Sequence, residues 1–198
     1  MQDKTTKDRI VDAMYALVAE KGYDKASIGQ IAQAIGIQKA SVYYYFKSKE
    51  DIFLGMVKKL YQEDVSAEAF FKEDITAAQY QSALIAAGEA FIDSYFEHQT
   101  LRKVYAEIDI QTSRIPALKE YVNLSGEKFR QRLAQTMVRG VAVGAFEKEC
   151  DTTLNSQLLY MVLTGIDQAI LYDLPIDVKA VWRAAVSQLP YRKAILSS

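Results

Sequence analysis

The residues from Gly36 to Lys49 combine the kinds of side chain that contact nucleic acid. The segment holds three lysines, three consecutive tyrosines and two serines, and it contains no acidic residue. Lysine ammonium and tyrosine hydroxyl groups can donate hydrogen bonds to phosphate oxygens, and small residues let a helix approach base edges in the major groove. The segment therefore predicts a surface that binds double-stranded DNA, with Lys39, Lys47 and Lys49 supplying positive charge.

Two short helices joined by a tight turn are expected to position this surface. Ser27 is a suitable N-cap, and apolar residues recur at helical spacing from Ile28 to Ile35. Gly36 can adopt the left-handed conformation that ends a helix, and a second helix is expected to begin near Lys39. This arrangement is a helix-turn-helix.

A helical wheel divides the second helix into two faces. Val42, Tyr45 and Phe46 fall together and are expected to pack on the core. The residues predicted to contact DNA, including the N-cap serine of the first helix, are Ser27, Gln38, Lys39, Ala40, Ser41, Tyr43, Tyr44 and Lys49. Within this set the lysines and tyrosines are expected to bind phosphates, and the residues at positions 38, 40 and 41 to read bases.

Several short motifs lie between Gly22 and Phe53. They are Gly22-Tyr23, Ile31-Ala32, Gly36-Ile37, Lys39, Tyr43, Tyr45-Phe46 and Ser48-Lys49-Glu50. Together they closely resemble the N-terminal DNA-binding domain of the TetR family of bacterial transcriptional regulators. The sequence has Ala26, Gln38, Ala40 and Val42 where the family often has Thr, Ser, Gly and Leu. Because positions 38 and 40 touch DNA in family members, these departures bear on which operator is recognised. Family members also often place a polar aromatic residue at the position of Tyr45 within reach of DNA.

The composition is typical of a globular protein with one or two domains. The chain has 198 residues, of which 50% are hydrophobic and 25% charged, and its formal net charge is −1. Residues 1–50 carry a local charge of +2, from eight basic and six acidic residues. This small excess argues against a protein that coats nucleic acid generally and favours a local basic patch presented by a dimer. No signal region and no run of 18 apolar residues occurs, so we expect a cytoplasmic protein without a membrane partner.

Helical periodicity continues along the chain and predicts an all-α architecture. We expect one helix at residues 6–21, before the helix-turn-helix, and a fourth that connects it to the rest and ends near Phe70. Four or five more are expected at residues 77–98, 100–113, 116–147, 152–172 and 177–194. The pattern breaks between Phe71 and Thr76. The predicted domains are therefore residues 1–70, the DNA-binding domain with its connecting helix, and residues 77–198, a larger helical domain.

The resemblance implies that this second domain encloses a cavity for a small-molecule effector. Large groups that could form its walls are Phe91, Tyr95, Tyr105, Ile108, Phe129, Leu133, Met137 and Tyr160, although packing in the core is the commoner role of such residues. Polar groups that could orient a ligand are Glu107, Asp109, Gln111, Thr164 and Asp167, although a solvated face accounts for most of them. Aromatic walls favour a hydrophobic or planar effector.

The last two predicted helices carry small and apolar residues that permit close helix approach. These residues are Leu158, Met161, Val162, Gly165, Ala169, Ala180, Val181, Ala184 and Ala185. The resemblance implies that the two helices pair with their symmetry mates in a homodimer, which would place two recognition helices over a palindromic operator. Trp182 either anchors this interface or packs within its own chain.

These features predict a homodimeric, ligand-responsive regulator that represses transcription. An effector that binds the state unable to span two successive major grooves would release it from DNA, with the fourth helix as the lever. The alternative is a DNA-binding head joined to a protein-partner interaction module without a small-molecule inducer. His98 has no partner at metal-ligand spacing, and the sequence contains no phosphate-binding glycine loop or paired-cysteine motif. We therefore expect no metal, no cofactor and no enzymatic activity.

Overall fold

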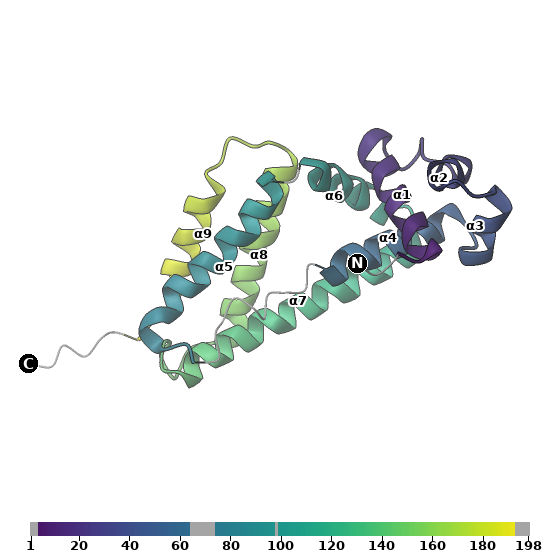
Figure 1. Ribbon diagram of the computed structural model, residues 1–198. Coiled ribbons are helices and arrows are strands. Elements are labelled where there is room, and N and C mark those ends of the chain that lie inside the picture. The colour runs from purple at the N-terminus through teal and green to yellow at the C-terminus, as the bar shows by residue number, and fades with distance from the viewer. Residues whose placement is uncertain (1–3, 64–73, 98, 193–198) are drawn as a thin grey trace, which may run out of the picture. The chain divides into compact units, whose positions relative to one another are not determined.

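The computed structural model describes residues 4–63, 74–97 and 99–192, and within these ranges nine helices confirm the all-α prediction (Figure 1). The chain divides into two compact units. The first contains α1 (Thr6–Lys21), α2 (Ile28–Ile35), α3 (Lys39–Tyr45), α4 (Lys49–Glu63), α6 (Gln99–Thr112) and the first turns of α7 (Pro116–Ala142). The second contains α5 (Ala77–Glu97), the rest of α7, α8 (Thr152–Leu171) and α9 (Val178–Ser187).

Capping boxes begin α1 and α2. The side chain of Thr5 accepts the backbone N–H of Asp8 at 3.2 Å, and the carboxylate of Asp8 accepts the backbone N–H of Thr5 at 3.2 Å. Ser27 and Gln30 exchange the equivalent pair of bonds at 3.3 and 3.1 Å. Such reciprocal bonds satisfy N–H groups that have no partner inside the helix. Both helices therefore begin where the sequence predicts.

The turns of the helix-turn-helix depend on two glycines and one extended residue. Gly22 follows α1 with φ 80°, and Gly36 follows α2 in the left-handed region with φ 72°. Both conformations favour a residue without a Cβ. Phe46 ends α3 in an extended conformation, with φ −139° and ψ 134°. The chain then enters α4 at Lys49.

The core of the first unit draws on α6 and α7 as well as on α1 to α4. Its buried members include Ile10, Met14, Ile31, Val42, Phe53, Val57, Val104, Ile108 and Leu118. Residues 104 and 108 come from α6, and residue 118 comes from α7. Burial of apolar surface is the main favourable term in folding, so α6 is fixed to the helix-turn-helix by the same core that holds its own helices together.

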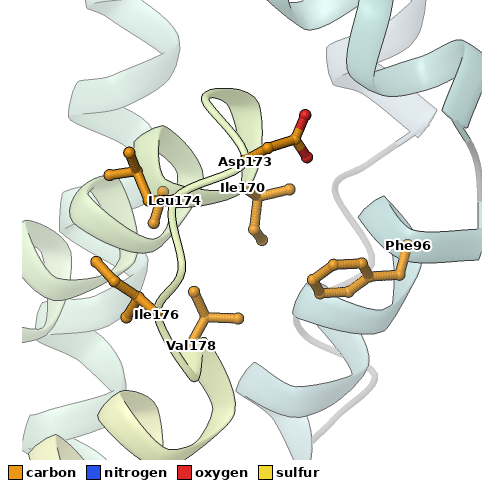
Figure 2. Close-up of a pocket in the computed structure, with 7 residues that line it drawn as sticks. Phe96, Ile170, Asp173, Leu174, Ile176 and Val178 are labelled. Carbon is orange, nitrogen blue, oxygen red and sulfur yellow. The ribbon is translucent and has the colours of Figure 1, made fainter.

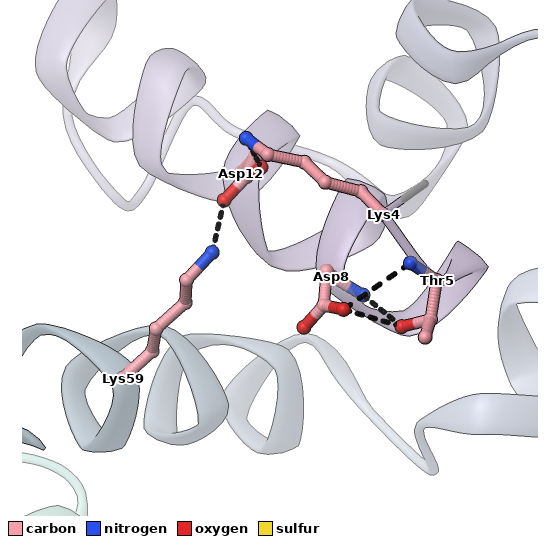
Figure 3. A network of polar contacts seen from close by, with 5 residues as sticks. All are labelled: Lys4, Thr5, Asp8, Asp12 and Lys59. Carbon is pink, nitrogen blue, oxygen red and sulfur yellow. Dashed lines mark hydrogen bonds and ion pairs between the residues drawn. The ribbon is translucent and has the colours of Figure 1, made fainter. Parts of the chain in front are cut away.

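A polar network ties α1 to α4 at the surface of this unit (Figure 3). One carboxylate oxygen of Asp12 accepts a hydrogen bond from Lys59 of α4 at 2.7 Å, and the other accepts one from Lys4 at 2.7 Å. Burial acts to raise the pKa of Asp12, but the hydrogen bonds and charges of the two lysines outweigh it and hold the pKa below its ordinary value. The network therefore stabilises the packing of α4 on α1 while Asp12 is ionised.

In the second unit, α5 packs beside α9, and α9 beside α8 (Figure 1). Trp182 of α9 is buried in this packing, with 1% of its surface exposed, and its indole N–H donates to the carbonyl of Ile85 in α5 at 3.0 Å. Gly88 lies against the ring, and a Cβ at that position would overlap the indole. Of the two roles considered for Trp182, packing within its own chain is the one observed.

Two helices end earlier than predicted. Helix α7 ends at Ala142 rather than near residue 147, and α9 ends at Ser187 rather than near residue 194. The segments that follow them pair through an isolated antiparallel bridge between Phe146 and Tyr191. Backbone bonds of 3.1 Å from residue 147 to residue 190 and of 2.9 Å from residue 192 to residue 145 support the bridge. Pro190 lacks an N–H and cannot continue a helix interior, which explains the earlier end of α9.

Some predictions fall on residues outside the described ranges. These include the end of the fourth helix near Phe70, most of the break between Phe71 and Thr76, and the environment of His98. The division into residues 1–70 and 77–198 stays a prediction. Within the ranges that are described, no helix is both long enough and apolar enough to span a membrane.

Candidate nucleic-acid interface

The outer face of α3 is uncovered. Six of the predicted DNA-contacting residues are exposed there: Gln38, Lys39, Ala40, Ser41, Tyr43 and Tyr44. Tyr44 is the most exposed of the three tyrosines, at 84%, and its ring meets that of Tyr45 edge to face at 5.0 Å. The side chain of Gln38 makes no capping bond to its own helix. This face therefore presents cationic, hydroxyl and amide groups outward from a helix whose opposite side, at Val42, is fully buried.

Tyr45 does not pack in the core, so its assignment by the helical wheel was wrong. Its side chain is 38% exposed, whereas that of Phe46 is 4% exposed. Because Phe46 has left the helix and is extended, its ring turns back to the interior. A Cβ at Gly55 of α4 would lie 3.1 Å from this ring, so the glycine makes room for it. The predicted burial of Phe46 is therefore confirmed, although this residue is extended, and the predicted burial of Tyr45 is not.

Ser27 and Lys49, the other two predicted DNA contacts, already have partners within the first unit. The hydroxyl of Ser27 takes part in the capping box of α2. The ammonium group of Lys49 donates to the carbonyl of Asp24 at 3.2 Å and lies 4.0 Å from the ring centre of Tyr23. Burial lowers the pKa of Lys49, opposed by the charges of Asp24 and Glu107. A phosphate contact by Lys49 stays a prediction, and it would have to extend or replace these contacts.

The predicted effector-binding residues are divided between the two units. Tyr105 and Ile108 lie on α6 in the first unit, where Ile108 is part of the core and Tyr105 approaches Tyr61 of α4 at 6.1 Å between ring centres. The other six lie in the second unit: Phe91, Tyr95, Phe129, Leu133, Met137 and Tyr160. Tyr95, Leu133 and Met137 are buried. The remaining three are partly exposed and take part in the aromatic pairs Phe91–Tyr95 and Phe129–Tyr160, at 5.3 and 6.1 Å. Their contact with an effector stays a prediction.

A small pocket, lined mainly by apolar residues, lies elsewhere in the second unit. Figure 2 shows Phe96 of α5 pointing toward Ile170 of α8 and Val178 of α9, with the loop between α8 and α9 closing the other side. Its volume is about 170 Å³, smaller than the roughly 300–1,000 Å³ of most ligand sites. None of the eight predicted effector residues lines it. This pocket was not predicted from the sequence; a signal that could have indicated it is the loop at Pro175, where Leu174 and Ile176 lie between Asp173 and Asp177.

The predicted dimerisation helices present an exposed apolar face. On α8 it contains Leu154, Leu158, Met161 and Gly165, and on α9 it contains Ala180, Val181 and Ala184. Met161 is 66% exposed, and a Cβ added at Gly165 would meet no atom within 4 Å. Among the other predicted interface residues, Ala169 is buried, and Val162 and Ala185 are partly buried. Positions 154, 158, 161 and 165 recur at helical spacing, so they lie on one side of α8.

The helix-turn-helix carries a family signature. The model described as "Bacterial regulatory proteins, tetR family" matches residues 10–56, which run from α1 into α4. Residues 10–56 therefore match the DNA-binding domain of the TetR family. All eight predicted DNA-contacting residues, from Ser27 to Lys49, fall within the matched segment. The predicted effector residues and the apolar face of α8 and α9 lie outside it.

Relatives extend this TetR likeness beyond the helix-turn-helix. The fatty acid metabolism regulator protein of Bacillus subtilis is 25% identical over 159 residues, which cover 77% of this chain and 76% of that protein. The negative transcriptional regulator IcaR of the biofilm operon in Staphylococcus aureus is 46% identical over 52 residues, covering 26% of this chain and 28% of IcaR. The crystal structure of FadR from Bacillus subtilis in complex with stearoyl-CoA has a TM-score of 0.71 at 22% identity and covers 92% of this chain and 97% of that one. The FadR structure therefore shares its fold with this chain along nearly the whole length.

One contact to the TetR helix-turn-helix was missed from the sequence. Glu107, considered as a group that might orient a ligand, instead accepts the backbone N–H of Tyr23 at 2.8 Å. The two residues are 84 positions apart in the chain, and no local pattern reports such a pairing.

Proposed function

We propose that this TetR-family regulator is a homodimeric repressor that binds a palindromic operator and is released by a small hydrophobic molecule. The observation that carries the proposal is the exposed face of α3, which is free of acidic residues and belongs to a helix-turn-helix that matches the family. Cationic and hydroxyl groups on such a face suit phosphates, and the small residues beside them suit base edges. The IcaR relative is a negative regulator, which supports repression.

Dimerisation is supported by the apolar face of α8 and α9. Two copies related by a two-fold axis would bury this face and bring the glycine side of one α8 against its partner. The two recognition helices could then enter successive major grooves about 34 Å apart on one side of the duplex. A single helix-turn-helix makes too few contacts for tight specific binding, so the dimer is part of the proposed function rather than an addition to it.

The effector is proposed to be a molecule with a long apolar part. Support comes from the relative in Bacillus subtilis that is a fatty acid metabolism regulator protein and from the FadR structure in complex with stearoyl-CoA. The second unit of this chain contributes aromatic and aliphatic side chains such as Phe91, Phe129 and Tyr160, which suit an acyl chain. We propose regulation of transcription without catalysis, in the cytoplasm where the operator DNA lies.

The experiment that tests this function has two stages. Selection from random duplex DNA with the full chain should enrich a palindromic sequence, and fluorescence anisotropy should then give its affinity. Stearoyl-CoA should weaken binding to that sequence, whereas coenzyme A alone, which lacks the acyl chain, should not. Failure of all acyl compounds to weaken binding would remove the effector from the proposal while leaving operator binding intact. A stable monomer in light scattering would favour the alternative of a DNA-binding head with a protein-partner module.

A further inference from the structure

The turn between α1 and α2 is held by a side chain from outside the helix-turn-helix. Glu107 of α6 accepts the backbone N–H of Tyr23 at 2.8 Å. Tyr23 is buried, so this N–H has little access to water, and leaving it without an acceptor would be costly. A carboxylate makes the bond charge-assisted and about twice as strong as a neutral one.

The turn is shaped to admit this carboxylate. Gly22 has φ 80°, and a Cβ at that position would lie 3.2 Å from Glu107 Oε1. The glycine therefore satisfies two requirements at once, the unusual backbone conformation and the close approach of the carboxylate. On α6 the neighbouring positions Val104 and Ile108 are buried in the shared core, which fixes the helix that carries Glu107.

The same turn also orients groups near the recognition helix. The ring of Tyr23 packs against Phe53 of α4 at 4.7 Å between centres, and the ammonium group of Lys49 lies over that ring and bonds to the carbonyl of Asp24. Arg114, just after α6, makes an exposed ion pair with Asp24 at 3.3 Å. Because both partners of that ion pair are largely solvated, it contributes less than the part-buried hydrogen bond from Tyr23 to Glu107.

We infer that Glu107 is a positioning residue for DNA recognition. By fixing the turn at residues 22–24 from α6, it sets the position of the amino end of α4 and of Lys49, and so the presentation of α3 to DNA. The inference rests on the proposed operator binding. It places a determinant of operator affinity outside the segment that matches the family, on a helix that the core joins to the helix-turn-helix.

The test compares Glu107→Ala and Glu107→Gln with the matched control Glu120→Ala, which removes an exposed acidic residue of α7 in the same unit. Two quantities are measured on the full chain: hydrogen exchange at the backbone amide of Tyr23, and affinity for the operator selected with the unaltered protein. Glu107→Ala should speed exchange at Tyr23 and weaken operator binding about tenfold, the effect of losing one hydrogen bond to a charged group. Glu107→Gln should show smaller changes than Glu107→Ala in both the exchange rate at Tyr23 and the operator affinity, because its amide oxygen can accept the same hydrogen bond. Glu120→Ala should match the unaltered protein.

A second arm separates positioning from general loss of stability. Thermal unfolding of each variant is recorded, and operator binding is measured well below its transition. In the double variant Glu107→Ala with Lys49→Ala, the two effects on affinity should not add, because Lys49 is held by the same turn. Unchanged operator affinity in Glu107→Ala despite faster exchange at Tyr23 would overturn the inference, as would additive effects in the double variant. If the unaltered protein enriched no DNA sequence, the proposed function itself would fail, and the exchange data would still show whether Glu107 holds the turn.

Discussion

Lys59 of α4 donates to Asp12 of α1 across 2.7 Å, and this contact joins the connecting helix to the first helix of the DNA-binding unit. Lys4 shares the same carboxylate. The helix proposed as the lever for release from DNA is therefore tied to the helix-turn-helix by polar contacts as well as by the core. Because Asp12 can be protonated, the contribution of this network to the free energy of unfolding can be measured by changing the pH.

Stability should depend on the ionisation of Asp12. Its pKa is lower in the folded protein than in the unfolded chain, so it stabilises the fold at pH values above the unfolded pKa of about 3.9. That contribution is lost as the pH falls through the folded pKa. For a partly exposed carboxylate we expect it to be at most about 1 kcal/mol. Urea unfolding of the unaltered protein and of Asp12→Asn should differ at pH 7, and the difference should shrink as the pH falls below the unfolded pKa. A difference that persisted undiminished at pH 3 would contradict the assignment.

Phe46 and Tyr45 should respond in opposite ways to truncation. Phe46 is buried against Gly55, so Phe46→Ala should lower the free energy of unfolding by about 3 to 5 kcal/mol, as for other large core residues. Tyr45→Ala should change it by less than about 1 kcal/mol, because the side chain is substantially exposed. Chemical denaturation of the two variants gives both values. Equal losses at the two positions would contradict the exposure of Tyr45 and mean that it packs as closely in the core as Phe46.

Substitutions of two helical glycines should have separate effects, one on the stability of the fold and the other on dimerisation. Gly88 faces the indole of Trp182, so Gly88→Ala forces a repacking and should destabilise the protein by about 1 to 3 kcal/mol. Gly165 faces open space in the single chain, so Gly165→Leu should leave the fold of the protomer intact. In the proposed dimer it should weaken association, because the bulkier side chain prevents close helix approach. Analytical ultracentrifugation and circular dichroism measure the two effects, and unchanged association in Gly165→Leu would exclude this face from the interface.

Measurements of DNA binding can test which residues of the helix-turn-helix contact phosphates and which recognise bases. Lys39→Ala should weaken all sequences similarly and reduce the slope of log affinity against log salt by about one per half-site, as expected for a phosphate contact. Gln38→Ala should instead change which operator sequence is preferred, at a cost of about 1 to 3 kcal/mol on the original site. Repeating the DNA selection with each variant distinguishes these outcomes. An identical preferred sequence for Gln38→Ala would show that the base-reading residues lie elsewhere.

Local chemistry made the helix-turn-helix predictable. N-caps, C-terminal glycines and apolar spacing act within a few residues, so the bounds of α1 and α2 followed from Ser27, Gly36 and their neighbours. The helical wheel failed at Tyr45, which it placed toward the core and which is substantially exposed. It also gave no indication that Trp182 would bond to Ile85 rather than face a partner, because an apolar stripe does not specify what covers it.

Sequence patterns could not predict contacts between segments that are far apart in the chain. The periodicity of α6 shows which of its faces is apolar, but not which core that face joins. Ile108 was predicted as a possible cavity wall, with core packing as the commoner role, and it lies in the core of the first unit. The bond from Tyr23 to Glu107 depends on the same placement of α6. The outer face of α3 was more predictable, since exposure there follows directly from burial of Val42 on the opposite side.

The most direct test of the proposed repressor is the stoichiometry and symmetry of its complex with selected DNA. Duplex DNA enriched from a random pool should contain an inverted repeat with half-sites about one helical turn or a multiple of it apart, and light scattering should show at least two chains on each duplex. Enrichment of a single, non-repeated half-site bound by one chain would contradict the homodimeric repressor that we propose.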